Sequence, residues 1–128
     1  MNPNPISLQA LVADDDDDMR FLMSSAFRRA GFRVRESSNG NELVAAFAAH
    51  ATADTVVIAD IGMPECDGIA AAIAMRKLEP LARIVLVTAS MDPATLANAR
   101  NSGAADVLYK PLDFNHLVRT ARSLLTPQ

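Results

Sequence analysis

An uninterrupted apolar run that ends in a single carboxylate constrains the fold of this chain more than any other segment. The run is Thr55-Val56-Val57-Ile58-Ala59-Asp60, and Gly62 and Pro64 follow it in a predicted loop. β-Branched residues without polar alternation are typical of a strand buried on both faces, and such strands belong to parallel sheets covered by helices. In open α/β sheets, ligands bind outside the carboxyl ends of the strands. Asp60 is therefore predicted to be functional.

Short strand-like runs alternate with helical segments along the chain. A helix is predicted after each of five strands, which lie at residues 8–13, 32–36, 55–60, 83–88 and 106–109. Asp92-Pro93 is typical of a helix start, and Gly31 and Gly103 are typical of helix ends. Because each right-handed crossover lays a helix on one face of a parallel sheet, this alternation predicts an α/β fold with both faces covered.

Apolar residues at helical spacing indicate which side of three helices faces the core. The first helix is predicted to bury Met19, Leu22, Met23, Ala26, Phe27 and Ala30. The third helix is predicted to use Ile69, Ala72 and Ile73. The last helix is predicted to use Phe114, Leu117, Val118, Ala121, Leu124 and Leu125. Each stripe would pack against the sheet.

Length and composition are those of a globular domain. A chain of 128 residues can bury about two thirds of its unfolded surface, so we expect one domain over 1–128 with a core at about 7–125. Hydrophobic residues make up 50% and charged residues 21%. The net charge is −3 and the basic residues are scattered, which predicts no direct nucleic-acid binding. We interpret one small basic group as solvated surface: Arg28, Arg29, Arg33 and Arg35.

The sequence predicts neither membrane association nor export. The first basic residue, Arg20, comes too late for a signal peptide, and no apolar run approaches the roughly 18 residues that span a bilayer. Cys66 is the only cysteine, which excludes an intrachain disulfide and suits a reducing compartment. We therefore expect a cytoplasmic protein.

Polar side chains stand at the carboxyl ends of four predicted strands. They are Asp14 and Asp15, then Asp60, Thr88 and Lys110. In a parallel sheet these ends lie along one edge, so the topology brings the side chains to one crevice. Each alone has an ordinary explanation, because acidic runs are usually solvated, threonine is common in strands and most lysines lie on the surface. Their coincidence at one edge favours a functional site.

Three carboxylates in one crevice repel one another. At an effective dielectric of about 20, each close pair costs about 4 kcal/mol, which is comparable with the net stability of a domain. Mg²⁺ would offset this cost, because it takes carboxylate, carbonyl and water oxygens and leaves a position for a phosphoryl oxygen. The carbonyl of Gly62 is well placed as a further ligand. Lysine and threonine can contact phosphoryl oxygens, and an aspartate can be the nucleophile that accepts the group.

The order and spacing of these residues resemble the receiver domain of two-component response regulators, including the chemotaxis regulators. The resemblance covers essentially the whole chain and rests on Leu11-Val12-Ala13-Asp14-Asp15-Asp16, Asp60-Ile61-Gly62-Met63-Pro64, Asp67-Gly68, Thr88-Ala89, Gly103-Ala104 and Lys110-Pro111. It implies a flavodoxin-like, doubly wound (βα)5 sandwich of three layers. Its five-stranded parallel sheet would have the strand order 2-1-3-4-5.

The resemblance also implies roles for single residues. Asp60 would be the phosphoacceptor, Thr88 and Lys110 would contact the phosphoryl group, and the bond before Pro111 would be cis. The Mg²⁺ ligands would be Asp14, Asp15, Asp60 and the Gly62 carbonyl. The donor would be a sensor histidine kinase or a histidine phosphotransfer protein. Phosphorylation would switch the surface of the fourth helix, last strand and fifth helix, on a monomer or a phosphorylation-dependent homodimer.

Two positions depart from the family pattern. Val107 stands three residues before the lysine, where the family usually has an aromatic switch residue, and Tyr109 lies two residues on, on the same strand face. Glu65-Cys66 replaces a more usual Gly-Met, and we interpret Cys66 as a packing residue rather than a redox sensor. The usual coupling from threonine to an aromatic ring is thus incomplete.

Two other functions compete with a phosphorylation-controlled signalling module. A phosphohydrolase of the haloacid dehalogenase type also combines a nucleophilic aspartate with threonine, lysine and paired acids. That family places its nucleophile in an Asp-x-Asp-x-Thr motif on the first strand, where this chain has Asp18 in place of the threonine. A degenerate receiver that only binds partners is disfavoured by the complete acceptor set. The sequence therefore predicts a non-enzyme that at most catalyses its own phosphorylation and dephosphorylation.

Overall fold

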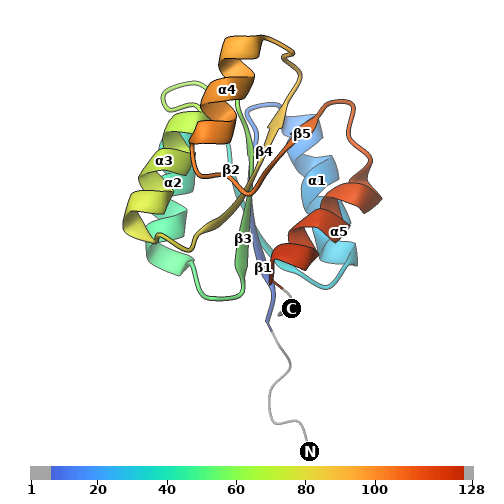
Figure 1. Ribbon diagram of the computed structural model, residues 1–128. Coiled ribbons are helices and arrows are strands. Elements are labelled where there is room, and N and C mark those ends of the chain that lie inside the picture. The colour runs from blue at the N-terminus through green and yellow to red at the C-terminus, as the bar shows by residue number, and fades with distance from the viewer. Residues whose placement is uncertain (1–6, 126–128) are drawn as a thin grey trace, which may run out of the picture.

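The computed structural model describes residues 7–125, which form a three-layer α/β sandwich (Figure 1). Within them, five strands alternate with five helices, in the order β1 (Gln9–Ala13), α1 (Asp17–Arg29), β2 (Arg33–Ser37), α2 (Gly40–His50), β3 (Thr55–Asp60), α3 (Gly68–Leu78), β4 (Arg83–Thr88), α4 (Pro93–Asn101), β5 (Asp106–Tyr109) and α5 (Phe114–Leu125). All strand pairs are parallel and the sheet order is β2-β1-β3-β4-β5. The predicted fold class and strand order are confirmed.

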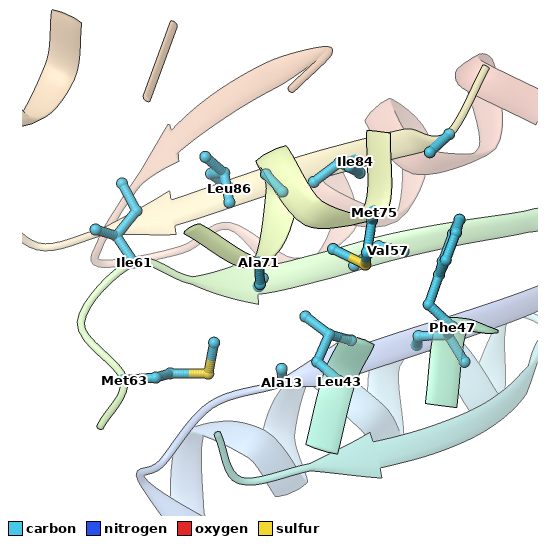
Figure 2. Packing of buried hydrophobic residues seen from close by; sticks show 14 of the residues in the cluster. Ala13, Leu43, Phe47, Val57, Ile61, Met63, Ala71, Met75, Ile84 and Leu86 are labelled. Carbon is cyan, nitrogen blue, oxygen red and sulfur yellow. The ribbon is translucent and has the colours of Figure 1, made fainter. Parts of the chain in front are cut away.

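The central strand β3 separates two hydrophobic cores. Every residue of β3 is buried, and its side chains alternate between the faces, with Val57 and Ala59 on one and Val56 and Ile58 on the other. Helices α1 and α5 cover the second face, whereas α2, α3 and α4 lie on the first (Figure 1). Figure 2 shows the first core, where side chains from α2 and α3 meet the strands. A continuous apolar strand is stable here because both faces are covered.

Aspartate or asparagine side chains cap the start of all five described helices, including α5, where Asp113 Oδ1 accepts from the His116 N–H at 3.1 Å. Asp16 accepts hydrogen bonds from the backbone N–H of Asp18 and Met19 at the start of α1. The same role falls to Asn39 for α2, Asp67 for α3 and Asp92 for α4. Each cap satisfies backbone donors that have no partner inside the helix. The helices that follow the strands are therefore started by local sequence signals at the carboxyl edge of the sheet.

Two residues of the predicted inner helix faces point to solvent instead. Leu22 of α1 is 46% exposed and Ile73 of α3 is 43% exposed. In α1 the buried stripe is centred on Met23 and Phe27, which leaves Leu22 beside it. In α3 small alanines and Met75 face the sheet. An alanine-rich helix gives a weak periodic signal, because small residues can lie against a sheet as closely as large ones. Among the described helices, none is long and apolar enough to cross a membrane.

Candidate functional site

Three aspartates meet at the carboxyl edge of the sheet. Asp14 follows β1 and Asp60 ends β3, and these strands are neighbours, with Ala13 opposite Ala59. One carboxylate oxygen from each of Asp14, Asp15 and Asp60 lies within 4.8 Å of the other two. Asp14 is fully buried and Asp60 is 7% exposed, whereas Asp15 is open to solvent. The parallel topology thus brings together acids from distant parts of the sequence.

The loop between β1 and α1 fixes the orientation of Asp14. The backbone N–H of Asp16 donates to Asp14 Oδ1 at 2.9 Å, and Arg20 Nη1 donates to the Asp14 carbonyl at 2.8 Å. Asp16 is also the cap of α1. One short segment therefore starts the helix and aims a buried carboxylate.

Arg20 joins this acidic loop to the neighbouring edge strand. Its guanidinium forms ion pairs with Asp17 at 2.6 Å and with Glu36 of β2 at 3.3 Å. The hydrogen bond to Asp17 is the main cause of a raised pKa for Arg20, so the side chain stays charged. Glu36 also pairs with Arg28 at 3.0 Å. Sequence reasoning missed this role of Arg20, although an acid three residues before it on a helix is a detectable signal.

Lys110 supplies the cation that faces the acids. Its Nζ lies 3.2 Å from Asp14 Oδ2 and 3.3 Å from Asp60 Oδ1, and the side chain is 20% exposed. Burial lowers the pKa of Lys110, but the charges of Asp60 and Asp14 outweigh it and leave that pKa raised. The bond between Lys110 and Pro111 is cis, as the resemblance implied. The lysine therefore bridges the two buried carboxylates as a fixed positive charge.

The site disfavours the ionised form of Asp60. Burial and then the charge of Asp14 raise the pKa of Asp60, while Lys110 lowers it in part. A neighbouring carboxylate about 4 Å away costs about 4 kcal/mol at an effective dielectric of about 20. One lysine against three acids leaves net negative charge at the edge of the sheet. The carboxylates are thus gathered at a cost that a further cation would reduce.

The donor set fits a hard divalent cation. Three carboxylates converge, and Gly62 lies beside them, because a Cβ added to Gly62 would stand 3.8 Å from Asp60 Oδ2. Oxygen ligands of this kind suit Mg²⁺, which also keeps several waters. Asp15 and Gly62 are exposed, so the cluster opens to solvent on that side. The crevice can therefore hold a cation together with an incoming anionic group.

Thr88 ends β4, next to the strand that carries Asp60. Its hydroxyl is buried and accepts a hydrogen bond from the backbone N–H of Ser90 at 2.9 Å. The Thr88 carbonyl accepts from the Lys110 backbone N–H at 2.8 Å. Within residues 7–125 the Thr88 hydroxyl makes no hydrogen bond to Asp60. Because its oxygen serves as an acceptor here, the hydroxyl proton is free to be donated.

Two glycines allow the loop after β3 to lie where it does. A Cβ on Gly68 would collide with the Asp60 carbonyl, and one on Gly40 would collide with the Cys66 carbonyl. Asn39 Nδ2 donates to Glu65 Oε2 at 3.1 Å and further ties α2 to this loop. Cys66 is half-buried against the core, and burial raises the pKa of its thiol, which agrees with a packing role. These close approaches position the segment that carries Gly62.

Val107, where the chain departs from the family pattern, and Tyr109, two residues on, both lie on β5. Val107 is half-buried against the core. Tyr109 is 39% exposed, and its hydroxyl lies 3.5 Å from Arg100 Nη2 of α4. A ring therefore stands on the face of β5 that α4 covers and contacts that helix through its polar end.

Known proteins match both the sequence and the fold. Residues 10–122 match the response regulator receiver domain family. The chain is 38% identical to the regulatory protein AtoC of Escherichia coli K12 over 110 residues, or 84% of this chain and 23% of that protein. It is 36% identical to the DNA-binding transcriptional regulator NtrC of Salmonella typhimurium over 107 residues, or 84% of this chain and 22% of that protein. The receiver domain of NtrX from Brucella abortus superposes with a TM-score of 0.82 at 26% identity, covering 91% and 98% of the two chains.

The chain belongs to the receiver domain family of two-component response regulators. It spans about a quarter of the length of its curated relatives, from 22% to 26%. The prediction of no direct nucleic-acid binding was wrong for this kind of protein, because several relatives are named DNA-binding transcriptional regulators. The error has a physical cause, because charge and composition report only on the segment that carries them, and this chain matches only about a quarter of the length of each such relative.

Proposed function

We propose that Asp60 of this receiver domain accepts a phosphoryl group while Asp14, Asp15, Asp60 and the Gly62 carbonyl hold Mg²⁺. The observation that supports this most is the convergence of three carboxylates within 4.8 Å, with Lys110 Nζ in contact with two of them. A bound cation would neutralise part of the negative charge of the acids and of the phosphoryl group. Receiver domains are signalling modules, and a phosphoryl group on Asp60 would add negative charge to the acidic edge of this one.

The transfer step uses groups that are already in place. An Asp60 carboxylate oxygen attacks phosphorus, a P–O bond forms, and the bond from phosphorus to the donor breaks, with its electron pair leaving on the donor. Lys110 would then contact a phosphoryl oxygen, and the Thr88 hydroxyl would donate its free proton to another. The only other chemistry we assign to the chain is hydrolysis, in which water attacks phosphorus, the P–O bond to Asp60 breaks with its electron pair on the carboxylate, and inorganic phosphate leaves.

We base the proposed phosphoryl donor on the family and the proposed output surface on the contacts of β5. We infer that a histidine kinase or a histidine phosphotransfer protein supplies the phosphoryl group. The surface of α4, β5 and α5 would respond, and Tyr109, which contacts Arg100 of α4, would take part of the role of the aromatic residue missing at position 107. The names of the relatives support a role in controlling a DNA-binding output.

Intact-protein mass spectrometry after incubation with acetyl phosphate and Mg²⁺ tests the acceptor. We expect one added phosphoryl group on the wild type and none on Asp60→Asn. The matched control is Asp54→Asn, which removes an acid at the opposite end of the same strand and should be labelled normally. Equal labelling of Asp60→Asn would refute the proposal. Turnover of a small phosphoester would instead favour the phosphohydrolase.

A further inference from the structure

Basic side chains gather on one side of the molecule, where the end of α1 lies against α5. A groove of about 300 Å³ runs between the two helices and is lined by Ala26, Arg29, Ala30, Asn115, Val118 and Arg119. We call this the α1–α5 groove. The small apolar side chains Ala26, Ala30 and Val118 line it together with two arginines and an asparagine. The groove thus offers apolar surface and positive charge together.

Contacts of Arg122 and of two phenylalanine rings hold α1 and α5 together beneath the groove. Arg122 Nη2 donates to the Ala30 carbonyl at 2.6 Å, and the Arg122 guanidinium lies 5.6 Å from the centre of the Phe32 ring. Phe32 in turn packs edge-on against Phe27, with ring centres 5.0 Å apart. Leu117 of α5 is fully buried in the same core. The two helices are therefore held at a fixed spacing, and the groove is formed before any ligand arrives.

Only some of the arginines on this side have partners. Arg28 pairs with Glu36, and Arg122 holds the Ala30 carbonyl. In contrast, Arg29 and Arg119 are exposed and form no ion pair within residues 7–125. They are also the two cations that line the groove. The charges that remain available for a partner are thus the ones placed beside the apolar surface.

We propose that the α1–α5 groove docks an acidic amphipathic helix of a partner protein. One apolar side chain of that helix would lie over Ala26 and Val118, and carboxylates three or four residues apart would face Arg29 and Arg119. Arginine pairs well with carboxylates because its planar guanidinium can bind both oxygens. An apolar surface between two cations favours such a peptide over a nucleic-acid backbone, which is bound by rows of cations.

The place of the groove leaves the acidic site open. Asp17 begins α1 and Arg29 ends it, so the two ends of the helix are about 18 Å apart, with the acidic loop before the first end and the groove at the second. The negative charge of that cluster repels an acidic helix, and the arginines attract it. The repulsion and the attraction together direct such a partner to the C-terminal half of α1. This docking does not depend on the proposed role of Asp60.

A designed peptide tests the groove directly. The probe is a fluorescently labelled helical peptide with a leucine stripe flanked by glutamates, and the matched probe carries lysines in place of the glutamates. We expect the glutamate peptide to shift the amide NMR signals of Ala26, Ala30 and Val118, and salt to weaken its binding. The double variant Arg29→Glu/Arg119→Glu should bind the peptide at least about tenfold more weakly.

The controls distinguish docking in the groove from a general effect of net charge. Arg33→Glu/Lys77→Glu makes the same change in net charge at two exposed residues outside the groove lining and should retain affinity within about twofold. Far-UV circular dichroism and urea denaturation of both double variants report whether they fold, independently of any phosphorylation of Asp60. Equal loss in both double variants, equal binding of the lysine peptide, or no shift at the groove would overturn the proposal. Duplex DNA that displaces the peptide through the same two arginines would reassign the groove to nucleic acid.

Discussion

The two edges of the sheet treat buried polar groups in opposite ways. At the amino edge, Gln9 Nε2 donates to Thr55 Oγ1 at 2.8 Å and to the His50 carbonyl at 3.0 Å. Arg83 donates there to the carbonyls of Leu124 and Ala53. At the carboxyl edge, like charges are held together, and the pKa of Asp60 is raised by burial and by Asp14. At the amino edge the buried polar groups are hydrogen-bonded, whereas at the carboxyl edge the carboxylates remain available to bind a cation or to react.

The two edges therefore show which polar residues contribute to stability and which contribute to function. A neutral, fully paired edge contributes to stability because no buried donor is left without a partner. Gathered carboxylates reduce stability until a cation is bound. Substitutions at the two edges should therefore move stability and phosphorylation independently, except where the backbone itself defines the site.

The largest effect is expected where the α3 start lies against the Asp60 backbone. Gly68→Ala should lower the free energy of unfolding by about 3 kcal/mol, because its Cβ would collide with the Asp60 carbonyl. It should also slow labelling by acetyl phosphate. Gly62→Ala is the control, since its Cβ would meet Asp60 Oδ2 at an ordinary 3.8 Å. Urea denaturation measures both, and an unchanged midpoint for Gly68→Ala would contradict the close approach.

A smaller loss is expected at the amino edge. The Thr55 hydroxyl accepts from Gln9 Nε2 and from the Thr52 backbone N–H, both at 2.8 Å. Thr55→Val should cost about 2 kcal/mol of unfolding free energy, because it leaves the Thr52 N–H without this partner. Phosphorylation should be unaffected. Thr120→Val is the control, because within residues 7–125 its hydroxyl makes no hydrogen bond. A large change in the labelling rate of Thr55→Val would break the separation of the two edges.

At the carboxyl edge, removing a charge should raise the free energy of unfolding instead of lowering it. Asp60→Asn should stabilise the metal-free protein by about 1 kcal/mol, because it relieves repulsion that Lys110 offsets only in part. Added Mg²⁺ should reduce the difference by stabilising the wild type. Thermal unfolding with a chelator and then with Mg²⁺ measures this. Asp54→Asn, at the other end of β3, should show neither effect, and a destabilised Asp60→Asn would contradict the repulsion.

The smallest effect is a pH dependence that belongs to Asp60. Its pKa is raised on folding, so the folded protein binds more protons than the unfolded chain from about pH 3.9 up to the raised pKa. Stability from this group therefore falls as the pH rises through that window. Glu42 and Asp92 have lowered pKa values and act in the other direction. The wild type minus Asp60→Asn, measured without metal, isolates the Asp60 contribution, and a difference that rises with pH would contradict it.

Most of the fold follows from local signals in the sequence. The apolar run of β3 and the aspartate caps place the elements, and the parallel topology then brings Asp14, Asp60 and Lys110 to one edge. The exposed Leu22 was not foreseen, since helical spacing alone does not say which of two adjacent apolar residues faces the sheet. Arg20 was missed as well, because its bond to the Asp14 carbonyl depends on how a loop folds back on a helix.

The bridge from Lys110 to Asp14 also bears on how the domain matures during synthesis. These two residues are 96 positions apart, so the contact joins the first strand to the last. While β5 is still inside the ribosome, Asp14 after β1 and Asp60 at the end of β3 can already be exposed without Lys110 beside them. The acceptor edge of this domain therefore gains its lysine only when β5 has joined the sheet, after β1 and β3 have already placed the acids.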